Sequence, residues 1–417
     1  MTYDVAIVGA GYVGVPLAQA FADSGRRVLL LDVLPEIVAA LNRGESHIID
    51  VASDQLEPHV TAGLIVATTD YEQLKDAAAI LIALPTPLTK QREPDLSYVE
   101  HASHAIGRIL QPGQIVVLES TTYPGTTREI VQPILEERSG LKAGVDFHLA
   151  MSPERVDPGR TDWTTKTTPK VVGGINAAST EAAAAVYHGA IDTIHTVSTP
   201  EAAELTKLLE NIFRSVNIAL VNELAQLCDR MDIDVWEVTG AAATKPFGFM
   251  PFQPGPGLGG HCIPLDPYYL AWKAREYDFA TRFIELAGEV NNNMPYFCRS
   301  VISQAMNHGL QKSLSGSRIL ILGVAYKADI GDTRETPAEK LVELLRTAGA
   351  DVSYHDPHVP EFDGMSSVAL EPEAYDCVAI VTAHSTLDYR DVVRRAQVVV
   401  DFRNATKDLE SEKVWKL

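Results

Sequence analysis

Residues 3–14 read YDVAIVGAGYVG, and this stretch decides the fold of the first part of the chain. Its apolar first half predicts a buried strand, and a helical pattern follows its end. Gly9, Gly11 and Gly14 stand between the two in the G-x-G-x-x-G spacing. This spacing allows a tight turn, lets a pyrophosphate approach the backbone and lets the helix pack closely on the strand, with the helix N-terminus facing the phosphates. The stretch therefore predicts a dinucleotide site in an α/β domain.

A carboxylate stands where such a site needs one. The next apolar run, residues 28–31, ends at Asp32, at about the distance from the glycines at which an acid accepts the hydroxyls of the adenosine ribose. Because the same acid would repel a 2′-phosphate, the sequence predicts NAD as the cofactor rather than NADP. Tyr12 and Val13, in the same turn, are expected to contact the cofactor as well. A glycine-rich turn in some other α/β domain is the alternative interpretation.

The composition fits a large enzyme of two or three domains. The chain has 417 residues, and its 55 acidic residues against 35 basic ones give a formal charge of -20, without a cluster of Lys and Arg. We therefore expect neither a nucleic-acid nor a membrane partner. No apolar run reaches the roughly 18 residues that span a bilayer, and the chain enters its first strand without a charged leader. These features predict a cytoplasmic protein.

The cysteines do not pair by spacing. They stand at positions 228, 262, 298 and 377, so the sequence predicts neither a disulfide framework nor a zinc site. Three of them fall in helical or apolar patterns and are interpreted as structural. The exception is Cys262.

Cys262 belongs to the segment 257–267, GLGGHCIPLDP. The glycines let backbone N–H groups and a ligand approach the sulfur. Asp266 and Pro267 are typical of a helix start, with Asp at the N-cap and Pro at the first helical position. A cysteine just before a helix N-terminus experiences a positive potential that favours the reactive thiolate, so Cys262 is the candidate nucleophile. The alternative is a small buried cysteine in a tight loop, with Asp266 acting only as a cap.

Strands and helices alternate up to about residue 197, which predicts a doubly wound parallel sheet with ligands at the carboxyl ends of its strands. Thr86 follows the apolar run 80–84, and Thr121 follows the run that ends at residue 118. Their hydroxyls are placed to donate to a pyrophosphate or a reacting oxygen, or else to cap the following helices. Glu154 offers a carboxylate at a third strand end.

A long helical pattern runs from Thr199 to about Met231, which is too long for a simple crossover. We interpret it as a central helix that joins two α/β domains and offers one face to a second subunit. Lys207 and Asn211 are four residues apart and share a face of this helix, so both are able to act on one ligand. By periodicity alone Lys207 would be a solvated lysine.

After Leu310 the strand-turn-helix-strand scheme begins again, but the turn at residues 323–327 lacks the glycine spacing. We expect a second Rossmann-like domain that binds a different nucleotide. Lys327, Arg334 and Arg403 are placed to meet phosphate and carboxylate groups, although each alone would more often be a surface charge. The predicted fold class is α/β, with two Rossmann-like doubly wound domains joined by a long central helix and a helical dimerisation region. The expected division is 1–197 for NAD, 198–310 for the helical region with Cys262, and 311–417 for the substrate nucleotide.

Together these motifs resemble the nucleotide-sugar 6-dehydrogenases, the family of the UDP-glucose and GDP-mannose dehydrogenases, over essentially the whole chain. The resemblance is carried by several ordered motifs, which are GAGYVG at 9–14, LPTP at 84–87, Ser120-Thr121, Ser152-Pro153-Glu154, Lys207 with Asn211, GGHCIPLD at 259–266, and Tyr326-Lys327 followed by Asp332-Thr333-Arg334. It implies an NAD domain, a helical middle that forms a homodimer or a higher homo-oligomer, and a C-terminal domain that holds the nucleotide of a UDP-sugar.

The resemblance also implies a chemistry. The C6 alcohol of the sugar becomes a carboxylate, and two hydrides pass in succession to two NAD⁺. Cys262 would hold the intermediate aldehyde as a thiohemiacetal and then as a thioester, which water cleaves. Lys207 would stabilise the oxyanion with the help of Asn211. Asp266 would assist proton transfer, Thr121 would position the reacting oxygen, and Glu154 would lie near the nicotinamide and act in thioester hydrolysis. Which of Lys207, Asp266 and Glu154 is the base in each step stays open.

The expected contacts follow from the same resemblance. The cofactor contacts are Gly9, Gly11, Tyr12, Val13, Gly14, Asp32, Thr86, Thr121 and Arg334. The substrate contacts are Glu154, Arg155, Lys207, Asn211, Gly259, Tyr326, Lys327 and Arg403. No metal is expected.

The chain departs from the best-known members of the family in two places. These members usually read Cys-Phe-Pro-Lys-Asp where residues 262–266 read CIPLD, and Phe-Leu-x-Glu where residues 155–158 read RVDP. Both departures, with RFIELA at 282–287, resemble the branch that oxidises UDP-N-acetylhexosamines. We therefore expect UDP-N-acetylglucosamine or UDP-N-acetylmannosamine rather than UDP-glucose. A two-electron dehydrogenase of the hydroxyacid type and a non-enzymatic NAD or nucleotide-sugar sensor are the competing interpretations.

Overall fold

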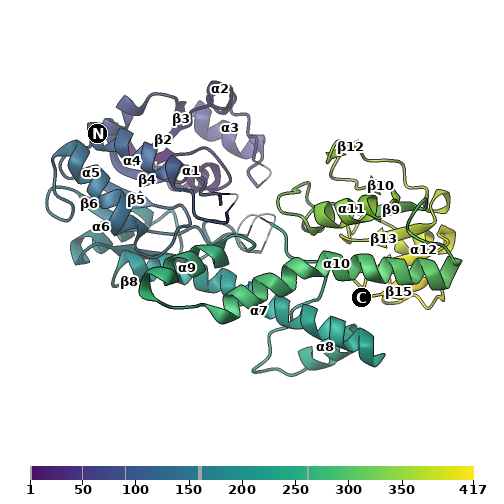
Figure 1. The fold of residues 1–417 in the computed structure, drawn as a ribbon. Coiled ribbons are helices and arrows are strands. Elements are labelled where there is room, and N and C mark those ends of the chain that lie inside the picture. The colour runs from purple at the N-terminus through teal and green to yellow at the C-terminus, as the bar shows by residue number, and fades with distance from the viewer. Residues whose placement is uncertain (1, 49, 90, 158–161, 261–262) are drawn as a thin grey trace. The chain divides into compact units, whose positions relative to one another are not determined.

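A computed structural model describes residues 2–48, 50–89, 91–157, 162–260 and 263–417. The chain divides into two compact units. The first consists of Met1–Glu210 with Tyr268–Phe279, and the second of Asn211–Pro267 with Ala280–Leu417 (Figure 1). Each unit contains its own sheet.

The sheet of the first unit has eight strands in the order β3-β2-β1-β4-β5-β6-β7-β8. Its strands are β1 (Tyr3–Val8), β2 (Val28–Leu31), β3 (Ile65–Thr68), β4 (Ala77–Ile82), β5 (Ile115–Leu118), β6 (His148–Met151), β7 (Lys170–Gly174) and β8 (Ile194–Val197). The strand order reverses direction between β1 and β4, and a doubly wound sheet binds its ligand at such a switch point.

One strand pair departs from the predicted parallel sheet. β6 and β7 pair antiparallel, with Ala150 opposite Gly174, whereas every other neighbouring pair in this sheet is parallel. A parallel return needs a crossover, usually a helix. Between β6 and β7 the described residues contain no helix, so the antiparallel return agrees with the connection that the chain provides.

Helices cover both faces of this sheet. They are α1 (Gly14–Asp23), α2 (Pro35–Asn42), α3 (Ser53–Thr61), η1 (Tyr71–Asp76), α4 (Ser97–Ile109), η2 (Thr127–Val131), α5 (Gln132–Ser139) and α6 (Ala177–Tyr187). Alternate strand residues enter opposite cores. Val5 and Ile7 pack with residues of α1 and α6, while Ala6 and Val8 pack with residues of α4 and α5. Continuous apolar runs such as that of β1 arise because such a strand is buried on both faces.

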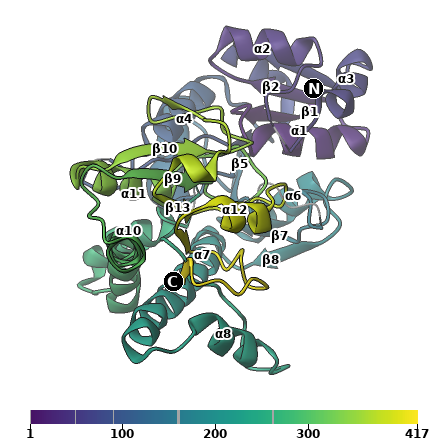
Figure 2. The same cartoon turned by 90° about the vertical axis from the view of Figure 1, so that its right-hand side faces the viewer.

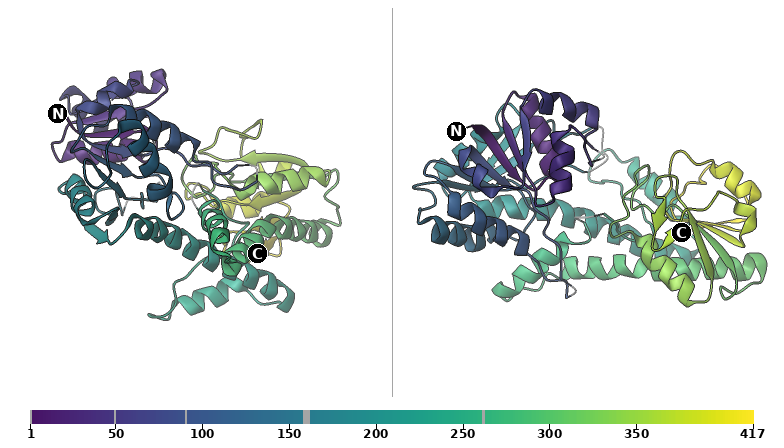
Figure 3. Two further views of the ribbon diagram at one scale, coloured as in Figure 1. Left: turned by 60° about the vertical axis from the view of Figure 1, so that its left-hand side comes forward. Right: turned by 90° about the horizontal axis from the view of Figure 1, so that it is seen from above.

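The predicted long helix is present as α7 (Pro200–Met231). In the second unit its residues from 211 onward pack against α10 (Arg282–Leu310), the other long helix visible in Figure 3. Asn222 of α7 donates from Nδ2 to Oδ1 of Asn291 in α10 over 2.9 Å, and both amides are buried. Two shorter helices and a helical turn complete the helical region: α8 (Val235–Ala243), α9 (Asp266–Ala274) and η3 (Arg275–Tyr277).

The second unit repeats the parallel sheet, as predicted. Its five strands are ordered β10-β9-β13-β14-β15, and β10, β9 and β13 are labelled next to one another in Figure 2. The elements are β9 (Arg318–Leu322), α11 (Pro337–Thr347), β10 (Asp351–His355), β11 (Glu361–Phe362), β12 (Met365–Ser366), η4 (Pro372–Ala374), β13 (Cys377–Ile380), α12 (Tyr389–Arg395), β14 (Val399–Asp401) and β15 (Val414–Lys416).

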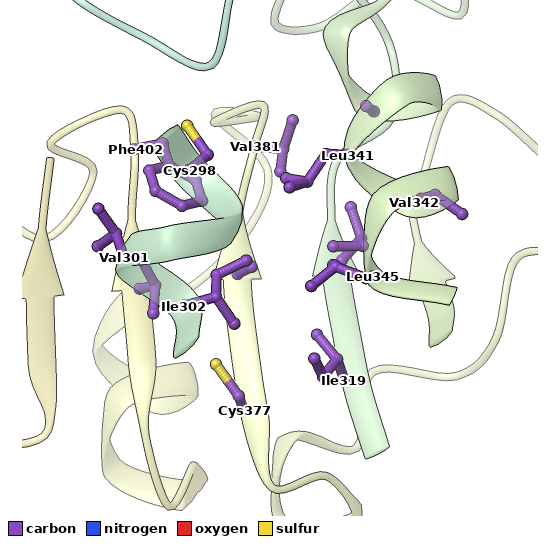
Figure 4. Close-up of a cluster of buried hydrophobic side chains, with 14 of the residues drawn as sticks. Cys298, Val301, Ile302, Ile319, Leu341, Val342, Leu345, Cys377, Val381 and Phe402 are labelled. Carbon is purple, nitrogen blue, oxygen red and sulfur yellow. The ribbon is translucent and has the colours of Figure 1, made fainter. Parts of the chain in front are cut away.

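Two cores lie on opposite faces of this second sheet. On one face α10 and α11 bury residues such as Cys298 and Leu341 against the strands, and Figure 4 shows Cys298 next to Phe402 and Leu341 next to Val381. On the other face α12 covers the sheet. Within the described residues, none of the helices combines the length and apolar character that crossing a membrane requires.

Candidate active site

The glycine-rich turn after β1 has the geometry that the sequence predicts. Gly9 has a φ of 106°, and a Cβ there would lie 2.3 Å from the carbonyl oxygen of Ala83. A Cβ on Gly14 would lie 1.8 Å from the carbonyl oxygen of Gly9, so helix and turn approach too closely for any other residue. A Cβ on Gly11 would meet nothing within 4 Å. The packing thus requires Gly9 and Gly14, while Gly11 borders open space, as expected where a pyrophosphate approaches the backbone.

Asp32 lies beside this turn, directly after β2. Its Oδ2 accepts the N–H of Ala10 over 3.0 Å, and its Oδ1 accepts the N–H of Leu34 over 3.0 Å. These two hydrogen bonds fix the carboxylate and leave lone pairs for further donors. The arrangement fits the adenosine ribose of NAD, whose hydroxyls are donors. Tyr12, in the turn, is 39% exposed and is accessible to a ligand.

The hydroxyls at the ends of β4 and β5 tie these strand ends together. Ser120 accepts the N–H of Leu84 over 3.0 Å, and Thr86 donates to the carbonyl oxygen of Thr121 over 2.7 Å. Thr86 is buried, whereas Thr121 is half-buried and able to reach a ligand. The two threonines therefore form one rigid edge of the sheet, and neither caps a helix.

Glu154 follows β6 at the same edge and is held at both carboxylate oxygens. Oε1 accepts the N–H groups of Arg155 and Val156 over 2.6 and 2.7 Å, and Oε2 lies 3.6 Å from Nζ of Lys170. Burial alone would raise the pKa of Glu154, but Lys170, the two N–H groups and Lys207 together hold the pKa below its usual value. Glu154 is therefore a carboxylate at neutral pH.

Lys207 of α7 is buried, with 7% of its surface exposed. The alternative of a solvated lysine is therefore wrong. Among the residues that the structure describes, none pairs with its ammonium group in a hydrogen bond or ion pair. A buried ammonium without a partner is costly, and such a group is suited to receive a negative ligand or reacting oxygen.

Glu204, one turn before Lys207, anchors α7 within the first unit. Its carboxylate accepts the N–H of Gly125 over 2.6 Å and both the N–H and the hydroxyl of Thr127 over 2.8 and 2.7 Å. Burial raises the pKa of Glu204 to about 7, against the lowering effect of these hydrogen bonds. No local sequence pattern indicates this role of Glu204, because its partners lie 77 to 79 residues away along the chain.

In the second unit, the glycine-rich segment before Cys262 is fixed by its backbone. Gly260 donates its N–H to the carbonyl oxygen of Arg334 over 3.1 Å, and a Cβ on Gly259 would lie 2.6 Å from Cβ of Tyr326. Gly255 donates to Oδ1 of Asn222 over 2.9 Å. Cys262 itself, with His261, lies outside the described residues.

Asp266, the other polar residue of this segment, is buried with 3% exposure and accepts Nδ2 of Asn211 over 2.5 Å. Helix α9 begins at Asp266, one residue earlier than predicted, so Asp266 is the first helical residue instead of the N-cap. The difference is one residue at a helix end, where the boundary is least sharply defined.

The predicted basic residues have different environments. Arg334 pairs with Asp332, 2.5 Å away, and Arg403 donates from Nε to the carbonyl oxygen of Val381 over 2.8 Å. Tyr326 and Lys327 are half-buried in the loop after β9. Arg334, predicted to contact the cofactor, lies in the second unit, whereas all the other predicted cofactor contacts lie in the first.

Arg155 is engaged within the protein. Its guanidinium contacts both carboxylate oxygens of Glu210, over 3.2 and 2.5 Å, and donates to the carbonyl oxygen of Pro169 over 2.5 Å. A contact from Arg155 to substrate would require this pairing to be shared or rearranged.

A Rossmann domain with this turn and this acid, in a chain that also contains a second parallel α/β domain, is typical of an NAD-dependent dehydrogenase. Three models of the UDP-glucose/GDP-mannose dehydrogenase family match the chain: the NAD binding domain at residues 3–191, the central domain at 201–293 and the UDP binding domain at 320–408. The chain belongs to this family.

Individual relatives agree. The chain is 35% identical over 411 residues to a UDP-N-acetyl-D-mannosamine dehydrogenase of Pyrococcus horikoshii, covering 97% of this chain and 96% of that protein. It is 35% identical over 390 residues to a UDP-N-acetyl-D-glucosamine 6-dehydrogenase of Pseudomonas aeruginosa, covering 91% and 90%. The solved structure of a UDP-D-ManNAc dehydrogenase from P. horikoshii superposes with a TM-score of 0.91 at 33% identity, covering 99% of this chain and 98% of that one. The predicted family, fold class and cofactor are confirmed.

Proposed function

We propose that this enzyme oxidises the C6 hydroxyl of UDP-N-acetylglucosamine or UDP-N-acetylmannosamine to a carboxylate, with two NAD⁺ consumed per sugar. The match to a UDP binding domain and the names of two relatives support this substrate class. So do the departures at residues 155–158 and 262–266 from the UDP-glucose pattern. UDP-glucose is the alternative substrate.

The proposed reaction balances with Cys262 as a covalent tether. Bound NAD⁺ supplies the hydride acceptor. The alcohol loses a hydride and a proton to give the aldehyde, whose carbon forms a C–S bond to Cys262. The resulting thiohemiacetal loses a second hydride and proton to become a thioester. Water then forms the new C–O bond, and the C–S bond breaks to return the thiolate. One water and two NAD⁺ thus yield one carboxylate, two NADH and three protons.

The burial of the Lys207 ammonium group is the main support for the proposed roles of the site residues. Lys207 is 7% exposed and has no hydrogen-bond or ion-pair partner among the described residues, so its charge is available to the oxygen of the alkoxide and of the later tetrahedral intermediates. Asn211 and Asp266, hydrogen-bonded to each other, would orient the neighbouring water or sugar oxygen. Glu154, ionised and held at both oxygens, would accept a proton during thioester hydrolysis. Thr121 would position the reacting oxygen.

The substrate is tested by the yield of NADH. Purified enzyme is given excess NAD⁺ and a limiting amount of UDP-N-acetylglucosamine, UDP-N-acetylmannosamine or UDP-glucose, and the final absorbance is converted to NADH per sugar. We expect two NADH from an N-acetylhexosamine and at least ~10-fold lower kcat/KM for UDP-glucose, since a site built around an acetamide leaves polar groups unpaired without it. One NADH per sugar would instead indicate a two-electron dehydrogenase, and none from any sugar would favour a sensor.

We also propose that the enzyme is a homodimer or a higher homo-oligomer through α7. In the second unit this helix exposes apolar side chains every three to seven residues along one stripe, formed by Phe213, Leu220, Leu224, Leu227 and Met231. Their exposed fractions run from 37% to 56%. A continuous apolar stripe of this kind is typical of a helix that packs against a partner. A second copy of the chain is the occupant that the family resemblance implies.

Charges on this stripe should dissociate the oligomer. We expect Leu220→Glu/Leu227→Glu to weaken association on the order of 100-fold or more, because each chain would bury two carboxylates without partners. Sedimentation equilibrium measures the change in mass. Asp229→Ala, an exposed position of α7 off the stripe, is the control and should leave the mass unchanged. A wild-type protein that sediments as a monomer would contradict the proposal.

A cytoplasmic location and a role in polysaccharide precursor synthesis complete the proposal. The location rests on the apolar and charge pattern of the sequence, and the role in precursor synthesis rests on the family resemblance.

A further inference from the structure

In the first unit, the buried Lys170 lies close to two carboxylates, those of the buried Glu119 and of Glu154. Nζ of Lys170, the first residue of β7, is 2.7 Å from Oε2 of Glu119 and 3.6 Å from Oε2 of Glu154. The side chains of Lys170 and Glu119 are 5% and 0% exposed. One ammonium group therefore serves two carboxylates where water is excluded, and a buried charge of this kind persists only with partners.

The groups around Glu154 come from four further elements. Lys170 belongs to β7 and Lys207 to α7, and both stabilise the carboxylate. Glu119 follows β5 and repels it. Tyr187 of α6 donates its hydroxyl to Glu119. Burial raises the pKa of Glu119, and Lys170 offsets part of this rise. Glu119 and Glu154 therefore compete for the charge of a single lysine.

We propose that Lys170 is a positioning residue. Glu119 holds Lys170 in place, and the ammonium group of Lys170 orients Glu154 and keeps it ionised for thioester hydrolysis. The inference rests on the proposed function of Glu154 as the base in that step. When water attacks the thioester carbon, its proton passes to Glu154 as the C–O bond forms and the C–S bond breaks. Lys170 touches neither substrate nor cofactor in this proposal and acts through Glu154 alone.

Two variants should move the pH profile in opposite directions. Activity requires ionised Glu154, so it is lost as the pH falls through the pKa of that carboxyl. Lys170→Met removes the stabilising charge, and the acidic limb of kcat should move to higher pH by about 1–3 units. Glu119→Gln leaves the ammonium to Glu154 alone, and the limb should move to lower pH. A purely structural role predicts no such opposite displacement.

Three further variants make the test specific. Lys170→Arg keeps a cation, so the acidic limb of its kcat profile should lie at nearly the same pH as that of the wild type. Lys273→Met is the matched control, because Lys273 is also a buried lysine that pairs with two carboxylates, Glu129 and Glu276, and not with Glu154. It should lower stability without moving the limb. Should Lys170→Met alone fail to fold, Lys170→Met/Glu119→Gln leaves no unpaired charge at 119, and its limb should still move to higher pH.

A direct titration separates this inference from the proposed function. The side-chain carboxyls are labelled with ¹³C-glutamate, and the signal of Glu154 is identified by its loss in Glu154→Gln. We expect the pKa of Glu154 to rise in Lys170→Met and in the double variant. An unchanged pKa in both would overturn the role of Lys170. A Glu154→Gln variant with the wild-type rate would overturn the catalytic role of Glu154, whatever the titration shows.

Discussion

Cys262→Ser is expected to abolish formation of the second NADH and to lower turnover on the order of 10³-fold or more. The serine hydroxyl is far less ionised at neutral pH than a thiol and is the poorer nucleophile toward the aldehyde. Without the tether, neither the thiohemiacetal nor the thioester forms. The measurement is NADH per sugar and kcat with the sugar that the wild-type enzyme prefers, together with mass spectrometry of the quenched enzyme, which should show the sugar on the wild-type protein and not on the variant.

The other cysteines provide controls within the same chain. Cys298 and Cys377 are fully buried, and burial raises the pKa of Cys377 to about 12 and that of Cys298 further. Their thiols stay protonated and inert at neutral pH. We expect Cys377→Ala to retain two NADH per sugar, at some loss of stability. Full activity of Cys262→Ser, with two NADH per sugar, would by contrast exclude the covalent route through this thiol.

The sequence predicts those parts of the fold that depend on local pattern. The strand at 3–8, the helix from about 200 to 231 and the return of the α/β scheme after 310 are each encoded by a run or a period within a few tens of residues. The antiparallel pairing of β6 with β7 is not encoded in this way. An apolar strand reads alike in both directions, and its pairing depends on the connection.

In the candidate site, too, local sequence patterns predict some residues and not others. Motifs with fixed spacing, such as the glycines and Asp32, are predictable because each glycine has its own steric reason to be there. Glu119, Lys170 and Glu204 were missed, because each finds its partner 51 to 79 residues away. One signal was available, since a charged residue that borders a strongly apolar run needs a buried partner. The roles assigned to Cys262, Lys207 and Glu154 stay predictions.

Lys207→Met is expected to lower kcat about 10²–10³-fold while changing KM by much less. A fixed cation stabilises an oxyanion more strongly in the transition state than it binds the neutral alcohol of the ground state, and the removal of one such donor typically has this cost. Met keeps the length of the side chain and suits a position that is 7% exposed, so the fold should persist. Steady-state kinetics and a melting curve measure the two effects separately.

The changes in kcat and KM of Lys207→Met distinguish two possible roles of the ammonium group. A fall in kcat and kcat/KM together, with KM nearly constant, would show that Lys207 acts on charge that develops during the reaction. A rise in KM at constant kcat would show that it binds a charge already present in the substrate, such as the pyrophosphate, and would contradict the proposed role. Lys207→Ala allows a second check, because it opens space where the side chain stood. Methylammonium added to this variant should restore part of kcat if a cation alone is needed, and an uncharged amide of similar size should restore none.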